Sequence, residues 1–258
     1  MKLNIFDSHA HYDDGDFNED REQVIKEIQE AGVVGVLNCG STIEGARMSL
    51  KLAEKYDIFY AAVGIHPEHA DQLDEAVFEE IKAMAKHQKV KAIGEIGLDY
   101  YWEENPPREV QQSTFRKQMA LAEELGLPVV IHDREAHEDT LKIIKEFPKV
   151  KGVLHCFSGS VEFAKQCLKE GYYLGITGVV TFKNAKKIVE VVKEVPMDRL
   201  LVETDCPYMA PTPYRGKRNR SDYILYILEE MANIKGVTVE EMCDKTRENI
   251  GDLLNLQL

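Results

Sequence analysis

The N-terminal segment Phe6-Asp7-Ser8-His9-Ala10-His11 places two histidines and an aspartate at the end of a short apolar run. Side chains of an extended strand alternate between its two faces, so His9 and His11 share one face, about 6–7 Å apart along the backbone. Asp7 has the same parity. Two imidazoles beside a carboxylate can bind a divalent metal ion. The segment therefore predicts part of a metal site, although two of the eight histidines can also fall close together near a terminus by chance.

Further residues of metal-ligand type occur where later apolar runs end. They are His66, Glu95, His132, His155 and Asp205. A single histidine of this kind is more often a hydrogen-bonded core residue, but its recurrence at the ends of several runs favours a shared site. Imidazole and carboxylate donors suit zinc, manganese or iron, and are less natural for an all-oxygen magnesium site.

The apolar runs alternate with segments of helical periodicity, and these elements must position the candidate ligands. Strands are expected at 3–6, 33–38, 59–65, 90–96, 128–131, 152–154, 172–176 and 200–202. Helices are expected at 19–31, 44–55, 75–86, 108–125, 135–147, 161–170, 185–195 and 222–235, followed by two short helices at 239–245 and 248–254.

Strands that alternate with helices run parallel, connected by crossover helices. Eight such units in about 250 residues predict an α/β fold, a (β/α)8 TIM-like barrel, as a single domain over residues 1–258. The alternative is an open doubly wound sheet, but the sequence lacks the glycine-rich phosphate loop that is typical of that class.

A barrel brings the carboxyl ends of all its strands to one rim, where catalytic groups of several strands meet. Alternation points His132, His155 and Asp205 inward, whereas Cys156 and Cys206 point outward as small packing residues. Four histidines, one glutamate and one aspartate suffice for two ions. We expect one ion at His9, His11 and Asp205, a second at His132 and His155, and Glu95 as the bridge between them.

Composition limits the class of protein. The net charge of −13 argues against a general nucleic-acid coat, but metal ions and a local basic loop can still supply a positive field to a nucleic-acid enzyme. The five cysteines are scattered without CxxC spacing, which fits a reducing compartment. No apolar stretch approaches the roughly 20 residues that span a bilayer. We expect a cytoplasmic monomer with no membrane contact and no obligate protein partner.

Seven motifs follow one another over essentially the whole chain: FDSHAH, GIHP, GEIGLDYY, LPVVIHDREA, HCFSGS, LLVETDCPYMAP and YRGKRN. As a set they resemble the TatD family of metal-dependent deoxyribonucleases, which belongs to the metallo-dependent hydrolases with TIM-like barrels. The resemblance implies a two-metal hydrolase of DNA phosphodiester bonds with exonuclease activity. It also implies metal ligands at His9, His11, Glu95, His132, His155 and Asp205.

The sequence departs from that family's pattern at two places. Asp133 occupies a position where serine is frequent, and Arg220-Ser221 stands where Glu-Pro is frequent. Neither departure affects a candidate ligand, so both concern contacts with the substrate.

The expected mechanism is hydrolysis by a hydroxide that two divalent ions (Zn, Mn or Mg) activate between them. Asp205 is the expected proton acceptor, and Glu95 is the second expected catalytic carboxylate. Glu203, one inward position before Asp205, either holds a ligand histidine by its second nitrogen or forms a salt bridge in the barrel interior.

Cationic or donor groups near the rim are expected to bind the phosphates of single-stranded or frayed DNA. The candidates are His66, Arg134, Arg215, Lys217 and Arg218. The last three belong to a basic loop that follows Asp205, although surface charge runs are commonly only solvated. Three aromatic residues, Tyr100 to Trp102, can stack an unpaired base or pack on their own helix.

Three other functions are compatible with a barrel of this kind. An amidohydrolase or deaminase of small cyclic amides would share the HxH start, but such enzymes often bridge their metals with a modified lysine, and no lysine ends the fourth or fifth strand. An ester hydrolase of D-aminoacyl-tRNA, a role linked to some members of the resembled family, would use the same site. A non-catalytic barrel stabilised by metal would not need six ligands at its mouth.

Overall fold

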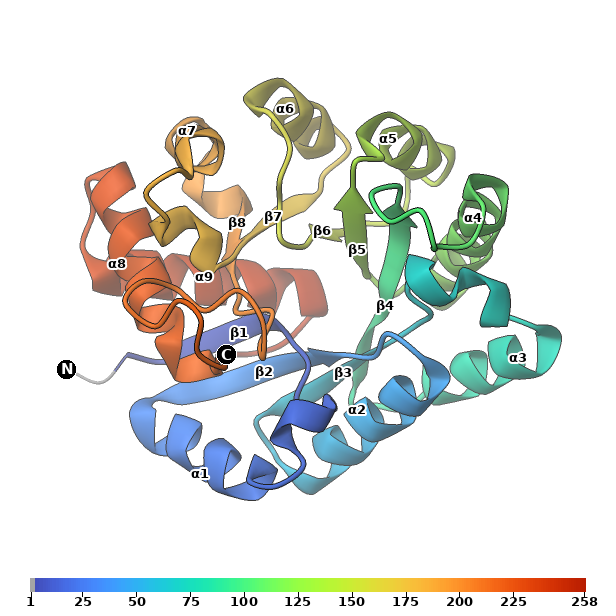
Figure 1. The fold of residues 1–258 in the computed structure, drawn as a ribbon, viewed down its shortest axis with the longest axis horizontal. Coiled ribbons are helices and arrows are strands. Elements are labelled where there is room, and N and C mark those ends of the chain that lie inside the picture. Colours follow the sequence, from blue (N-terminus) through green and yellow to red (C-terminus); the bar gives the residue numbers. More distant parts are fainter. Residues whose placement is uncertain (1–2) are drawn as a thin grey trace.

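Eight parallel strands follow one another in sequence order around a nearly closed barrel, and helices surround them, as predicted (Figure 1). A computed structural model describes residues 3–258, so the first two residues of the expected domain lie outside the described residues. The strands are β1 (Ile5–Ala10), β2 (Val33–Cys39), β3 (Phe59–Val63), β4 (Val90–Asp99), β5 (Val129–Arg134), β6 (Gly152–Leu154), β7 (Tyr173–Ile176) and β8 (Leu200–Val202). The helices are α1 (Arg21–Ala31), α2 (Ile43–Lys55), α3 (Glu75–Met84), α4 (Arg108–Leu125), α5 (His137–Glu146), α6 (Val161–Lys169), α7 (Lys186–Glu194), α8 (Ile224–Lys235) and α9 (Val239–Leu254).

Apolar side chains of the strands alternate between two clusters. Val130, Val153 and Leu201 belong to the cluster inside the barrel. Their neighbours Ile131 and Leu154 belong to the larger cluster between the strands and the helices. A parallel strand that is buried on both faces reads as a continuous apolar run for this reason. The inward and outward directions predicted for β5, β6 and β8 are confirmed.

The C-terminal segment forms one helix, α9, and the prediction of two short helices was wrong. Thr238 caps it, because its hydroxyl accepts from the backbone of Glu241 and the Glu241 side chain accepts from the backbone of Thr238. Thr246, at the expected break, donates its hydroxyl proton to the Met242 and Cys243 carbonyls, so its polar group is satisfied inside the helix.

Helix α9 closes the end of the barrel opposite the candidate site. Ile250 belongs to the interior cluster, and Asn249 donates to the Leu200 carbonyl where β8 begins. Arg247 donates to the carbonyl of Asn4, just before β1. These contacts place the helix at the amino ends of the first and last strands.

Three strands extend beyond the carboxyl ends of the apolar runs that predicted them. β1 runs to Ala10, β4 to Asp99 and β5 to Arg134. β3, in contrast, ends at Val63, two residues earlier than expected. The extensions of β1 and β5 place His9 and His132 within strands, which fixes their backbone.

The first and last strands meet at the seam of the barrel, where β1 (blue) and β8 (orange) lie side by side in Figure 1. Ala10 and Cys206 form a parallel bridge. The His11 amide donates to the Cys206 carbonyl (2.8 Å), and the Asp205 amide donates to the His9 carbonyl (3.0 Å). The candidate ligands at this seam thus also close the barrel. Within residues 3–258, no helix has the length and apolar character needed to cross a membrane.

Candidate metal centre

Four candidate ligands converge at the seam. The Nε2 atoms of His9 and His11 are 2.9 Å apart. Oε2 of Glu95 lies 3.3 Å from the His9 atom and 3.5 Å from the His11 atom. Oδ1 of Asp205 lies 3.6 and 3.4 Å from the same two nitrogens. Donors about 2.1 Å from a tetrahedral zinc ion are about 3.4 Å apart, so these four atoms have the spacing of a shell around one cation. We call them the first donor group.

A second donor group surrounds the other oxygen of Glu95. Its Oε1 lies 2.7 Å from Nε2 of His155 and 3.0 Å from Nδ1 of His132. These two nitrogens are 3.3 Å apart. The carboxylate of Glu95 therefore has one oxygen in each group, which is the arrangement expected of a bridge between two ions.

His66 also points into the second donor group. Its Nε2 lies 3.4 Å from Oε1 of Glu95, and its Nδ1 accepts a hydrogen bond from the Glu68 amide. The ring is buried and packs edge-on against His132. His66, Glu95 and His132 thus form a group whose donor atoms are close enough to hold a metal ion, whereas the sequence analysis assigned His66 to phosphate binding and not to either ion.

Asp99 is a functional candidate that the sequence analysis missed. Its Oδ2 lies 2.9 Å from Nε2 of His132, the ring nitrogen that faces away from Glu95. The alternation of β4 contained the signal, because Glu95 and Asp99 are four residues apart on one face. Gly97 lies between them with φ +142°, and a Cβ there would lie 2.0 Å from the His132 carbonyl oxygen. A glycine is therefore needed for β4 to approach β5 this closely.

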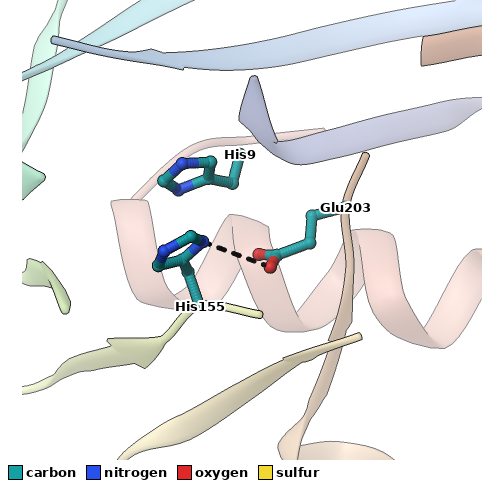
Figure 2. Close-up of side chains that lie close together, drawn as sticks. All are labelled: His9, His155 and Glu203. Carbon is teal, nitrogen blue, oxygen red and sulfur yellow. Dashed lines mark ion pairs between the residues drawn. The ribbon is translucent and has the colours of Figure 1, made fainter. Parts of the chain in front are cut away.

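Glu203 lies beside His155, and its carboxylate points toward the His155 ring (Figure 2). Its Oε1 accepts from the Cys156 amide at 2.5 Å and is 3.6 Å from Nδ1 of His155, slightly beyond hydrogen-bond distance. The carboxylate is fully buried. Gly175 makes room for it, since a Cβ there would lie 2.3 Å from Oε2.

The rings of His9 and His155 stack on each other to one side of this carboxylate (Figure 2), with centroids 3.9 Å apart and planes 12° apart. Nδ1 of each ring is buried and has no hydrogen-bond partner within the described residues. Buried polar atoms are normally satisfied. These are not the nitrogens of the donor groups, which are Nε2 of both rings, so the case for a cation rests on the spacing of the donor atoms.

Asp7 does not belong to either donor group, so the expectation that it shares a face with His9 was wrong. The pairing of β1 with β2 is irregular between Asp7 and Ala10, which breaks strict alternation. The carboxylate accepts from the Thr204 amide (3.0 Å) and hydroxyl (2.6 Å) and from the Ser221 hydroxyl (2.7 Å). Burial raises the pKa of Asp7 to about 7, although these hydrogen bonds act in the opposite direction.

At both places where the sequence departs from the family pattern, the side chain forms a hydrogen bond within the protein. Ser221 fastens the loop after β8 to β1 through Asp7, as just described. Asp133 pairs with His137 on α5, with Oδ2 2.8 Å from Nδ1. Alternation along β5 places it on the opposite side of the strand from His132.

Burial and neighbouring charges set the protonation of the ligands in opposite ways. Burial lowers the pKa of His11, but the hydrogen bond to Asp205 and the charge of Glu95 outweigh it and raise the value to about 9. Burial raises the pKa of Glu95, but the adjacent histidines hold it well below its ordinary value. The pKa of Asp205 is lowered by the same kind of neighbours. Both carboxylates are therefore ionised at neutral pH.

Two residues at the site have left-handed backbone conformations. Cys156 has φ 44° and Asp205 has φ 56°. Each conformation costs roughly 1 kcal/mol or more for a residue with a side chain and persists only when its surroundings fix it. Cys206 is fully buried, as expected, but Cys156 is partly exposed and lies near the Thr177 hydroxyl. β6 ends at Leu154, so alternation does not extend to Cys156.

The basic loop after β8 is divided between paired and exposed cations. Arg218 forms two hydrogen bonds to the Asp20 carboxylate, at 2.9 and 2.6 Å. Arg215 is exposed, with its guanidinium 4.2 Å from the centre of the Phe182 ring. Lys217 is exposed, and within residues 3–258 its side chain forms no hydrogen bond or ion pair. Arg134 lies at the end of β5, over aromatic rings.

An eight-stranded α/β barrel with imidazole and carboxylate donors at the carboxyl ends of its strands is the architecture of metal-dependent hydrolases. A model of the family described as TatD related DNase matches residues 6–255. The chain belongs to this family and is a metal-dependent hydrolase, as the sequence motifs indicated.

Similarity to individual relatives extends over the full chain. The uncharacterized metal-dependent hydrolase YabD of Bacillus subtilis is 44% identical over 254 residues, which cover 98% of this chain and 99% of YabD. The 3'-5' ssDNA/RNA exonuclease TatD of Erwinia tasmaniensis is 36% identical over 260 residues, with 98% and 100% covered. The crystal structure of the TatD homolog YjjV of Escherichia coli K12 has a TM-score of 0.93 at 30% identity and covers all of both chains.

Proposed function

We propose that this protein hydrolyses phosphodiester bonds at unpaired ends of DNA with the help of two divalent metal ions. The observation that carries the proposal is the carboxylate of Glu95, whose two oxygens lie in two separate donor groups. The naming of a full-length relative as a 3'-5' ssDNA/RNA exonuclease supports the choice of substrate.

Zn, Mn or Mg ions bound at the two donor groups would supply Lewis-acid charge and a readily deprotonated water for an in-line displacement. His9, His11 and Asp205 would hold one ion, His132 and His155 the other, and Glu95 both. Asp205 is the better proton acceptor of the two carboxylates, because its side chain is 13% exposed whereas that of Glu95 is 3% exposed. Asp205 can therefore take a proton from the attacking water and return it to the leaving oxygen.

Residues behind the ligands would hold them in position. Asp99 accepts from Nε2 of His132 and Glu203 faces Nδ1 of His155, which fixes the ring orientation of each. The exposed cations Arg215 and Lys217 would attract the phosphates of the strand to this rim of an otherwise acidic protein. Arg218 would support the same loop through its pairing with Asp20.

The proposal includes a cytoplasmic monomer. Both donor groups are complete within one chain, so the site does not require a second copy. The five cysteines are free, which fits a reducing compartment.

The test is cleavage of an end-labelled single-stranded oligonucleotide and of its duplex with added Mg²⁺, Mn²⁺ or Zn²⁺. We expect metal-dependent shortening of the single strand, and loss of this activity in His155→Ala. The matched control is His87→Ala, since His87 contacts Glu54 on α2, away from the donor groups. An enzyme that leaves every oligonucleotide intact but opens dihydropyrimidine-type amides would be an amidohydrolase. Release of D-amino acids from tRNA without cleavage of DNA would instead favour the ester hydrolase.

A further inference from the structure

Exposed large apolar side chains are concentrated at the rim that carries the donor groups. Among the described residues, four of the six follow β4 or β8, and they are Tyr101, Trp102, Tyr208 and Met209. Large exposed apolar groups in one place indicate a binding surface more often than single scattered ones do. The aromatic pair after β4 has further contacts that indicate what it binds.

Tyr100, the first aromatic residue of this loop, packs against the protein. Its hydroxyl donates to Asp139 (2.9 Å), and the Arg108 guanidinium lies 4.2 Å from the centre of its ring. Tyr101 and Trp102, in contrast, are 47% and 42% exposed. Packing on the neighbouring helix therefore accounts for Tyr100 but not for the other two rings.

The two exposed rings are arranged around a guanidinium. They are nearly perpendicular, at 87°, with centroids 4.7 Å apart. The guanidinium of Arg134 lies 3.9 Å from the centre of the Tyr101 ring and 5.3 Å from that of Trp102. Aromatic faces beside an arginine are the combination on which unpaired bases stack, since every base has a π-face and the cation is attracted to the backbone phosphates.

This group is connected directly to the second donor group. The Tyr101 amide donates to Oδ1 of Asp99 (3.0 Å), while Oδ2 of the same carboxylate contacts His132. Arg134 follows His132 by two residues on β5, a separation of about 6–7 Å along a strand. A nucleotide whose phosphate lies at the donor groups would therefore have its base near these rings.

We propose that Tyr101, Trp102 and Arg134 form a stacking platform for the base next to the phosphodiester bond that is cleaved. The inference rests on the proposed nuclease function and specifies how the same site selects its substrate. A paired base is covered by its neighbours in a duplex, so the platform favours single strands and frayed ends.

Trp102 is the only tryptophan of the chain, so its fluorescence reports on the platform alone. The probe is a single-stranded DNA oligonucleotide with phosphorothioate linkages, which resist hydrolysis, added to the metal-loaded protein. We expect binding to quench the emission. The same strand with abasic sites at its end should bind without this quenching.

Kinetics give a second, independent readout on cleavable strands. Stacking on an aromatic ring typically contributes enough that Trp102→Ala should lower kcat/KM about tenfold, equivalent to about 1.4 kcal/mol. Trp102→Phe should restore most of the loss. An abasic end should slow the wild type to a similar degree and should have little further effect on Trp102→Ala. Tyr56→Ala is the control, because Tyr56 is the C-cap of α2, just before β3 begins and therefore at the opposite end of the barrel.

Three results would each have a definite meaning. Quenching together with a base-dependent loss in Trp102→Ala supports the platform. Hydrolysis with unchanged emission, and equal rates on normal and abasic ends, overturns the platform but leaves the nuclease function intact. Failure to bind or cleave any oligonucleotide overturns the nuclease function, and the platform with it.

Discussion

Replacing Glu203 with glutamine should weaken metal binding without unfolding the protein. The amide has the shape of the carboxylate and can still accept from the Cys156 amide, while the negative charge behind His155 is lost. Partners behind metal ligands typically change metal affinity or activity by about 10- to 100-fold. The 3.6 Å separation from Nδ1 is long for a hydrogen bond, so we expect the lower end, about tenfold or about 1.4 kcal/mol.

The loss should depend on pH, because Glu203 stabilises a proton on His155 as well as a metal ion. Burial lowers the pKa of His155, but Glu95 and Glu203 raise it well above its ordinary value, so a metal ion must displace a proton at neutral pH. In Glu203→Gln the proton on His155 is held less strongly, so it competes less with the metal ion at pH 7 and part of the lost metal affinity is recovered there. A divalent ion gains more from the carboxylate than a proton does, so metal binding is still weaker than in the wild type. The ratio of the variant's metal dissociation constant to that of the wild type should therefore increase from pH 7 to pH 9.

The assay is competition for Zn²⁺ or Mn²⁺ against a chromogenic chelator, with thermal unfolding measured in parallel. Ser8→Ala is the control: it removes a 3.5 Å contact to the other oxygen of Glu203 and a 3.0 Å hydrogen bond to the Val202 carbonyl, and it leaves the charge of Glu203 in place. A Glu203→Gln protein with unchanged metal affinity at both pH values, but lower stability, would refute the positioning role. Glu203 would then be only an interior acceptor for the backbone.

Three further predictions concern charge at the site. Lys217→Ala should weaken binding of single-stranded DNA, measured by fluorescence anisotropy, and reduce the salt slope of binding by about one without changing the melting temperature. Arg218→Ala should instead lower the melting temperature, because it removes the bonds to Asp20. Equal effects of the two variants in both measurements would contradict the distinction between a DNA-binding Lys217 and a structural Arg218. Protonated His11 stabilises the folded, metal-free protein because its pKa is raised to about 9. This stabilisation, about 3 kcal/mol, is complete below about pH 6.5 and is lost as pH rises through about 9. The melting temperature of the chelator-treated protein should therefore fall between these pH values, and a flat profile would contradict the prediction. Asp99→Asn should reduce metal-dependent cleavage by about 10- to 100-fold and leave a folded barrel, as circular dichroism would show; full activity would exclude a role in orienting His132.

Much of the fold was predictable because each strand is a short apolar run followed by a polar residue. Parallel strands with alternating faces gather their ends at one rim, so distant residues such as His132 and His155 could be placed together without any contact information. The division of these ligands between two ions that share Glu95 stays a prediction, for which the two oxygens of Glu95 supply suitably placed donors.

The parts that sequence could not supply depend on local irregularity and on pairing. A break in the register of β1 turns Asp7 toward Thr204, and alternation cannot anticipate such a break. The inward turn of His66 depends on a loop conformation. Among the cations of the basic loop, only the structure separates the paired Arg218 from the exposed Lys217, because its partner Asp20 is almost two hundred residues away in the chain.

The seam between β1 and β8 determines when the first donor group can form during folding. His9 and His11 belong to the segment of the first strand and Asp205 follows the eighth, so almost two hundred residues separate them in the chain. The first donor group is therefore incomplete until β8 has been synthesised and has joined β1. Its assembly requires closure of the barrel, so metal binding at this group reports that the first and last strands have met.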